Sequence, residues 1–475
     1  MLYTLAGSLP MASAVILLPL YMNYLPTAVY GQLAIYLAFS MLLQIIITYS
    51  LDSSIYIYFH EFKKDPDKLS AFISSAFVFI LLAGLIVGVV TFVGGFFFFE
   101  RFFKDQGITF YPYGLMSVVT AIFQSVFKVY SSLLQSREQP LQYFWSNILL
   151  FSLIATFTFL GLWFFPGTLN GPIGGRMIAS IFSAVWCLIS VFREFGFHFN
   201  YSLLRSSFEY NRSSFIYQLQ LWSMNSLDKM ILVFFVTLSE VGVYDFALKC
   251  MLVIDFIIGG LYNSFYPRVL GQIMSQEKKQ TTIEINRYYH GLTAVVMLLV
   301  CLSIPAFMVL SDSGLIKSGY EESIRYLPFV GVIYLLRSMR YYFVMPYGAL
   351  KYSRPLPWIY LMLSACKIGL LLILGKRFGV YAVIIATLVS SVLEIILLKL
   401  FVDKKFVFKM NVLKLVGAPL LLASVYVTSA LVMKDPGYIL QLAILSLCVI
   451  LLWWIYRNEI KQIRFFKYFE SGPKE

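Results

Sequence analysis

Apolar windows of about 20 residues recur some 14 times along this 475-residue chain. Each window is long enough to cross the hydrocarbon core of a bilayer as one α-helix. The chain is 60% hydrophobic and only 13% charged, whereas soluble chains are about 25% charged. We therefore predict an all-α, polytopic membrane protein with about 14 transmembrane helices. The predicted spans are 5–24, 31–57, 70–98, 111–134, 142–165, 173–192, 214–237, 241–265, 289–310, 326–348, 356–374, 380–400, 412–432 and 438–456.

Lysine and arginine gather in alternate connections between these spans. About 23 of the 37 fall on the side that also holds both termini, about 8 on the opposite side and about 6 within spans. The positive-inside rule assigns the richer side to the cytosol, so we expect cytoplasmic N- and C-termini. The same asymmetry accounts for the net charge of +13 without a nucleic-acid partner. Connections on the opposite side are short, which leaves no room for an extracytoplasmic domain.

Two short motifs recur at an offset of roughly 210 residues. Y-G-Q-L at 30–33 resembles V-G-V-Y at 241–244, and M-I-A-S-I-F-S-A-V at 177–185 resembles I-I-A-T-L-V-S-S-V at 384–392. An even number of spans separates the copies, so both halves point the same way. The interface of such parallel repeats is the expected substrate site. We predict two pseudo-symmetric six-helix lobes around a central cavity plus two C-terminal helices, with domains 1–200, 201–403 and 404–475.

Charged side chains lie deep inside the predicted span 214–237, where a charge costs about 2.5–3.5 kcal/mol on insertion scales. Asp228 and Lys229 are neighbours and point about 100° apart, so each needs water or a partner on another helix. Gln218, Asn225 and Asp228 form one stripe at the positions i, i+7 and i+10. A polar stripe on an apolar helix must face the bundle interior or a wet cavity.

Longer polar stripes follow two helices of the first half. One repeats in steps of three or four and the other in steps of four, a slightly slanted line. They consist of Ser117, Thr120, Gln124, Lys128, Ser131 and Gln135 in the span 111–134, and of Tyr36, Ser40, Gln44, Thr48 and Asp52 in the span 31–57.

The second half carries like charges of its own. Arg337 and Arg340 are three apart with no acid nearby in sequence, which favours a bound anion or acids from neighbouring helices. Asp245 and Lys249 stand four apart and can pair along one face. For the cations, snorkelling or pairing with unmatched acids is the alternative. Lys367, Asp255 and Glu394 are further charged residues of the second half of the chain that lie in or near the ends of spans.

Taken together, these stripes predict a wet, cation-lined cavity between lobes. A phosphate-bearing substrate suits it, because Arg forks and Lys ammonium groups bind phosphate oxygens well. Catalytic signals are poor: G-K-R at 375–377 lacks the spacing and the hydroxyl residue of a Walker A motif. The three histidines are spaced too widely for a zinc motif. We therefore expect a transporter rather than an enzyme, with no cofactor; a coupling ion, Na⁺ or H⁺, stays open.

The stretch N-S-L-D-K-M-I-L-V-F-F-V-T-L-S-E-V-G-V-Y-D-F-A-L-K at 225–249 resembles the seventh-to-eighth helix signature of polysaccharide-biosynthesis flippases. These belong to the multidrug/oligosaccharidyl-lipid/polysaccharide (MOP) exporter superfamily. L-L-P-L-Y-M-N-Y-L-P-T-A-V-Y-G-Q-L (17–33), L-L-Q-S-R-E-Q-P (133–140) and G-V-Y-A-V-I-I-A-T (379–387) resemble other helix junctions of the family. The resemblance implies a flippase for undecaprenyl-diphosphate-linked oligosaccharide units, working by alternating access in the bacterial cytoplasmic (inner) membrane. It carries over Asp228, Lys229, Tyr244 and Lys249.

These interpretations give one candidate site. The diphosphate is expected to bind Lys128, Lys249, Arg337 and Arg340. The sugars are expected to hydrogen-bond Asp52, Asp228 and the stripe amides, among them Gln124 and Asn225. The expected partners are the lipid-linked glycan and membrane lipids, with polysaccharide polymerase and export proteins as further candidates.

Two other functions stay open. A major-facilitator-like transporter for a small solute shares the two-lobe plan, but it usually shows G-x-x-x-D-x-x-G-R-R between helices two and three. H-E-F-K-K-D-P-D-K at 60–68 does not match that motif. A membrane polysaccharide polymerase or glycosyltransferase commonly needs a sizeable external loop, and none is predicted. Within the superfamily, the charge-free first predicted helix lacks the acid of drug/cation antiporters and the Arg–Asp pair of lipid II flippases.

Overall fold

The computed structural model describes residues 14–274, 278–349, 352, 354–403, 411, 413–432 and 438–462. All regular elements within these ranges are helices, and eight helical segments there are long and apolar enough to cross a membrane. Within the described residues the predicted spans fall on helical segments, so the predicted all-α, multi-pass fold is confirmed. The first residues of the span 5–24, the predicted cytosolic segments around 275–277 and 404–410, and the end of the tail lie outside the described residues.

The chain groups into two compact units by its internal contacts. Unit 1 comprises Met1–Phe246 and Ile368–Val383, and unit 2 comprises Ala247–Lys367 and Ile384–Glu475. Three helices, which begin at Leu238, Leu356 and Val380, therefore contribute residues to both units. The domain boundaries predicted after residues 200 and 403 stay predictions.

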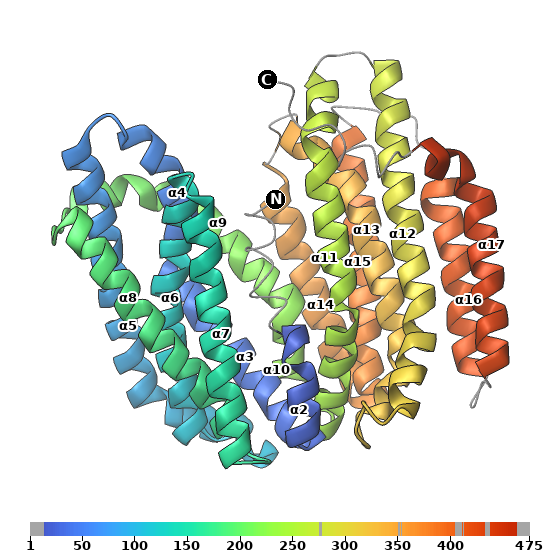
Figure 1. Ribbon diagram of the computed structural model, residues 1–475, viewed down its shortest axis with the longest axis horizontal. Coiled ribbons are helices and arrows are strands. Elements are labelled where there is room, and N and C mark those ends of the chain that lie inside the picture. The colour runs from blue at the N-terminus through green and yellow to red at the C-terminus, as the bar shows by residue number, and fades with distance from the viewer. Residues whose placement is uncertain are drawn as a thin grey trace. The chain divides into compact units, whose positions relative to one another are not determined.

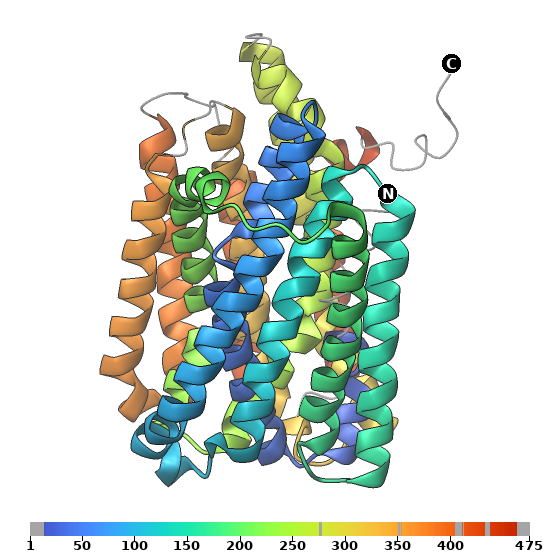
Figure 2. The ribbon, with the colours of Figure 1, turned by 90° about the vertical axis from the view of Figure 1, so that its left-hand side faces the viewer.

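Unit 1 is a bundle of helices that are mostly long enough to span a bilayer. Its elements are α2 (Leu18–Tyr24), α3 (Thr27–Thr48), α4 (Leu51–Phe62), α5 (Pro66–Phe103), η1 (Lys104–Gln106), η2 (Phe110–Gly114), α6 (Leu115–Ser136), α7 (Pro140–Phe164), η3 (Asn170–Gly174), α8 (Gly175–Phe195), α9 (Tyr201–Trp222), η4 (Ser223–Leu227) and α10 (Asp228–Leu232). Helix α6 contacts α3, α4, α5, α7 and α8, and the long helices run side by side (Figures 1 and 2). The core of unit 1 therefore surrounds α6.

Local sequence signals set several helix starts in unit 1. Asp65 caps α5, where its carboxylate accepts a hydrogen bond from the Lys68 backbone N–H, and Pro66 follows at the first helical position. Asn200 caps α9 in the same way, and Pro140 opens α7. Side-chain acceptors satisfy orphan N–H groups, and proline has no N–H to leave unsatisfied.

Unit 2 contains the remaining helices, three of which it shares with unit 1. These elements are α11 (Leu238–Met274), α12 (Lys278–Asp312), η5 (Glu321–Arg325), α13 (Leu327–Ala349), α14 (Leu356–Phe378), α15 (Val380–Asp403), η6 (Leu413–Gly417), α16 (Ala418–Val432) and α17 (Tyr438–Gln462). Helix α17 packs on α12, and α16 packs on α13. The two C-terminal helices thus extend the packed face of unit 2.

Two helix starts of unit 1 meet at a pair of glycines, one from each copy of the repeated motif. A Cβ on Gly31 of α3 would lie 2.0 Å from the Leu238 carbonyl oxygen, and a Cβ on Gly242 of α11 would lie 2.1 Å from the Thr27 carbonyl oxygen. The Thr27 and Ser239 hydroxyls are 2.6 Å apart across this crossing. Only glycine permits so close a backbone approach. The glycines of the two motif copies therefore pack directly against each other's helix.

Candidate functional site

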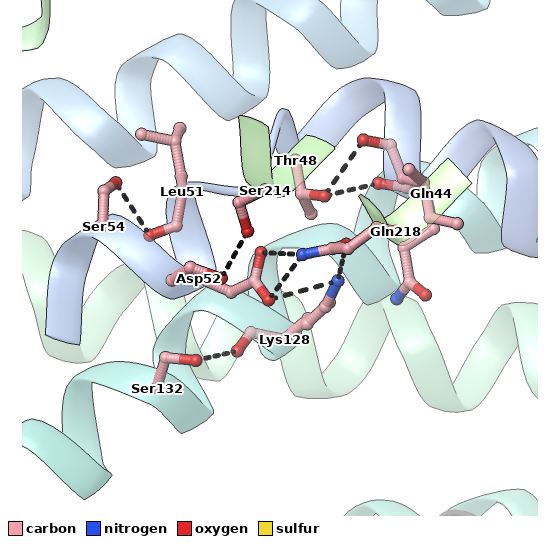
Figure 3. A network of polar contacts seen from close by, with 11 residues as sticks. Gln44, Thr48, Leu51, Asp52, Ser54, Lys128, Ser132, Ser214 and Gln218 are labelled. Carbon is pink, nitrogen blue, oxygen red and sulfur yellow. Dashed lines mark hydrogen bonds and ion pairs between the residues drawn. The ribbon is translucent and has the colours of Figure 1, made fainter. Parts of the chain in front are cut away.

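A polar network in unit 1 joins three helices through Asp52, Lys128 and Gln218 (Figure 3). The Lys128 Nζ lies 3.3 Å from Asp52 Oδ2 and donates to Gln218 Oε1 at 2.9 Å. The Gln218 amide nitrogen in turn donates to both Asp52 oxygens, at 3.4 and 3.3 Å. The Lys128 and Asp52 side chains are 30% and 15% exposed. The network is satisfied internally, yet a ligand can reach its charges.

A backbone break places Asp52 in this network. Tyr49 and Ser50 adopt left-handed conformations, with φ of 43° and 56°, and they separate α3 from α4. Asp52 therefore lies in the first turn of a new helix instead of continuing α3. Left-handed conformations are costly for residues other than glycine and are commonly retained at functional positions.

The slanted stripe predicted on 31–57 is accordingly not one continuous line. The Tyr36 hydroxyl donates to the Thr109 carbonyl, and the Thr48 hydroxyl donates to carbonyls of its own helix. Asp52, beyond the break, is the stripe residue whose side chain contacts Lys128 and Gln218 (Figure 3). The prediction of a single stripe was wrong because steps of four assume an unbroken helix.

The stripe on α6 lies along one unbroken helix, but its members differ in whether they contact another helix. Ser117 and Thr120 donate their hydroxyl groups to carbonyls one turn earlier in the same helix. Gln124 is half-buried and makes no hydrogen bond within the described part of the chain. Lys128 alone of these residues forms an ion pair with another helix. Hydroxyl groups on a helix usually satisfy themselves locally, whereas a long Lys side chain does not.

The predicted span 214–237 is interrupted by the π-helical segment η4 between α9 and α10. This insertion changes the angular register, so Gln218, Asn225 and Asp228 do not form the single inward stripe that was predicted. Asn225 is exposed and donates its amide to the Leu221 carbonyl. Asp228 is buried and accepts a hydrogen bond from the Lys229 backbone N–H at 2.9 Å.

Lys229 has a partner on another helix, as we predicted for a charge within a membrane span. Its Nζ lies 2.5 Å from Asp245 Oδ1 on α11, and the two side chains are 15% and 0% exposed. Tyr244, beside Asp245, is 1% exposed, and Lys249 one turn further is half-buried. The side chains of Lys229 and Asp245 are therefore more buried than those of Lys128 and Asp52.

In unit 2, Arg337 and Arg340 of α13 pair with acids from neighbouring helices, which is the second of the two alternatives that the sequence left open. Arg337 Nη1 lies 2.9 Å from Asp255 Oδ2 of α11. Arg340 Nε lies 2.7 Å from Glu394 Oε1 of α15, and its Nη2 donates to the Tyr360 hydroxyl at 3.1 Å. Both arginine side chains keep about a quarter of their surface exposed, 28% and 26%.

Aromatic rings complete these arginine sites. The Arg337 guanidinium lies 4.9 Å from the Tyr334 ring centre, and that of Arg340 lies 5.5 Å from the Tyr360 ring centre. Such contacts orient the planar fork while leaving its edge for carboxylate or phosphate oxygens. The cations that were predicted to be bare, Arg337 and Arg340, are therefore members of ion pairs, because isolated charges within the membrane are costly. No group of three or more metal-ligating side chains occurs among the described residues.

The fold is similar to those of several solved membrane transporters. The chain is similar to the lipid II flippase MurJ in an inward closed conformation, at 17% identity and a TM-score of 0.69, covering 96% of this chain and 98% of that one. It is similar to an inward-facing multidrug resistance MATE transporter of the MOP superfamily, at 10% identity and a TM-score of 0.62, covering 85% and 95%. The MATE multidrug transporter DinF-BH gives 16% identity and a TM-score of 0.55, covering 85% and 93%.

The fold and its long apolar helices thus define a multi-pass membrane protein. The chain belongs to the polysaccharide biosynthesis protein family, whose family model matches residues 1–274. Comparison with curated proteins found no match. The family resemblance identified from residues 225–249 is therefore confirmed.

Proposed function

We propose that this protein is a flippase that moves undecaprenyl-diphosphate-linked oligosaccharide units across the bacterial inner membrane by alternating access. The observation that carries the proposal is the network of Asp52, Lys128 and Gln218, an accessible ion pair inside membrane-spanning helices. Membership of the polysaccharide biosynthesis family supports the substrate class. The similar fold of MurJ, a lipid II flippase, agrees with this choice, because lipid II is another lipid-linked glycan.

The network suggests how a diphosphate is held and released. Without substrate, Asp52 neutralises Lys128 and thereby removes the cost of an unpaired charge in the membrane. A diphosphate carries more charge and more acceptor oxygens than a carboxylate, so it displaces Asp52 from Lys128. Asp52 and Gln218 then become free to hydrogen-bond the sugar hydroxyls. The exchange keeps the charges compensated throughout the cycle.

The displaced acid offers a place for energy coupling. Once Lys128 turns to the diphosphate, the Asp52 carboxylate lacks a cation, and a proton or Na⁺ supplies one. Substrate and ion then bind together or not at all, which is the requirement for coupled transport. In unit 2, Arg337 and Arg340 exchange Asp255 and Glu394 for phosphate oxygens in the same manner. We propose Lys249 as a further phosphate ligand from the family pattern.

Reconstitution into liposomes tests the proposal. A lipid-diphosphate sugar is placed in the outer leaflet, and its accessibility to an external lectin is followed over time. Loss of accessibility without new glycosidic bonds is expected for the flippase. New bonds would indicate a polymerase or glycosyltransferase, and uptake of free sugar without lipid movement would indicate a small-solute carrier. In cells, Lys249→Ala and Arg337→Ala are expected to block glycan export while the protein still reaches the membrane, whereas normal export would remove them from the site.

A further inference from the structure

An apolar cavity of about 290 Å³ lies in unit 2 between α13, α15 and the segment formed by η6 and α16. Its walls include Met339 and Phe343 from α13, Ile396 from α15 and Val416 from η6. The one charged residue that lines it is Lys399 of α15. Ligand pockets usually measure roughly 300–1,000 Å³. The cavity is therefore large enough for part of one hydrocarbon chain but not for a whole lipid.

The cavity is separate from the arginine sites of the same helices. Along α15, Ile396 and Lys399 are three positions apart and share a face, whereas Glu394 lies on the opposite side by helical spacing. Along α13, Met339 and Phe343 are four apart, and Arg340 points about a quarter-turn away from them. A ligand in this cavity would therefore not occupy the ion pair of Arg340 with Glu394.

Lys399 is the feature that selects a ligand. Its side chain is half-buried, and it forms no ion pair or hydrogen bond with any described residue. It lies four residues before Asp403, the last residue of α15. Since α15 has 24 residues and is about 36 Å long, its end reaches past a hydrocarbon core of about 30 Å. A lysine this close to the end of a membrane-spanning helix can extend its ammonium group to the interface, where lipid phosphate groups lie.

We propose that this cavity binds one acyl chain of an anionic phospholipid, whose phosphate pairs with Lys399. Val392 and Ile396, which line the cavity, are 43% and 48% exposed, so its mouth opens on the outer surface of α15. A small soluble anion would gain nothing from these apolar walls, and a peptide helix would need a longer groove. The lipid is a resident ligand rather than cargo, so the inference does not depend on the proposed function.

Native mass spectrometry of the purified full-length protein tests this inference. The protein is equilibrated with equal amounts of phosphatidylglycerol and phosphatidylcholine, and the retained lipid is quantified for each variant. The wild type is expected to retain phosphatidylglycerol preferentially. Lys399→Gln is expected to weaken that preference about fivefold, the usual contribution of one Lys near anionic lipid. Lys376→Gln, which removes an exposed lysine near the end of α14, is the matched control and is expected to leave it unchanged.

A second variant separates the cavity from the charge. Ile396→Trp fills the cavity from an exposed position and keeps Lys399, so it is expected to reduce retention of both lipids without unfolding the protein. The inference is overturned if Lys399→Gln retains phosphatidylglycerol as the wild type does, or if Ile396→Trp retains both lipids unchanged. It is equally overturned if a polyprenyl diphosphate displaces phosphatidylglycerol from the wild type but not from Ile396→Trp, because the cavity then belongs to the transported lipid.

Discussion

Two Lys–Asp pairs in unit 1 have the same chemistry but different surroundings. Lys128 and Asp52 are 30% and 15% exposed, are 3.3 Å apart and share an amide bridge. Lys229 and Asp245 are 15% and 0% exposed and are 2.5 Å apart. Breaking a buried pair strands a charge, whereas breaking an accessible one lets water or a ligand replace the partner. We infer that the deep pair holds the fold and that the accessible pair exchanges with substrate.

The largest expected effect is on the deep pair. Lys229→Ala removes the ammonium group that lies against the buried Asp245 carboxylate, which should lower the free energy of unfolding by about 3–5 kcal/mol. Thermal unfolding in detergent, followed by tryptophan fluorescence, measures the loss. The double variant Lys229→Met with Asp245→Leu removes both charges and should recover most of it. A single variant as stable as the wild type would show that the deep pair is not a structural one.

A smaller loss of stability is expected at the close crossing of α3 with α11, the helix that carries Asp245. Gly242→Ala places a methyl group against the Thr27 carbonyl of α3, where a Cβ has only 2.1 Å. The helices must separate, at a cost of about 1–3 kcal/mol typical of overpacking. Gly94→Ala is the control, since nothing lies within 4 Å of a Cβ there. Equal stability of both variants would contradict the close crossing.

The accessible pair should respond in the opposite way. Lys128→Ala should change the free energy of unfolding by less than about 1 kcal/mol, because Asp52 keeps the Gln218 amide and reaches water. Glycan export should nevertheless fall by roughly tenfold or more, since one charge-assisted phosphate contact is lost. Export in cells with matched membrane levels gives the second readout. A stable Lys128→Ala protein with normal export would contradict the proposed exchange of Asp52 for the diphosphate at Lys128.

The smallest effect is expected at a pair that is exposed on both sides, Asp65 with Lys68, 3.0 Å apart outside the membrane spans. The Lys68 side chain, by hydrogen bonding, lowers the pKa of Asp65 below its usual value. The folded pKa is thus below the unfolded one, so the stabilisation is complete above the unfolded value of about 4 and is lost as the pH falls through the folded one. Unfolding curves of wild type and Asp65→Asn should therefore differ slightly at pH 6 and converge at the acid end. If the stability difference between the wild type and Asp65→Asn grew as the pH fell, it would contradict a lowered pKa of Asp65 in the folded state.

Much of the fold was predictable because each membrane-spanning helix requires a run of about 20 apolar residues, which is visible in the sequence. Length and hydropathy alone predicted the multi-pass helical fold, and the charge of Lys229 correctly required a partner on another helix, Asp245. The repeated Gly31 and Gly242 motifs were visible as a repeat. That they touch each other was not, because sequence periodicity contains no distance between helices.

The site was predictable only in part. Helical spacing assigned Lys128 correctly to an inward face, but the breaks at Tyr49 and Ser50 and at η4 disrupted two other stripes. Single-residue conformations of this kind have no hydropathy signature. The pairing of Arg337 with Asp255 and of Arg340 with Glu394 also needed three dimensions. A usable signal existed, since acids within or near the spans nearly match the cations in number.

The most direct measurement compares the two pairs in one transport assay. Proteoliposomes carrying wild type, Lys128→Ala, or the double variant Lys229→Met with Asp245→Leu are given the same lipid-diphosphate glycan, and its flipping rate is measured. We predict near wild-type flipping by the folded double variant and a loss of roughly tenfold or more for Lys128→Ala. Rapid flipping by Lys128→Ala, with the folded double variant inactive, would contradict the assignment of substrate exchange to the accessible pair.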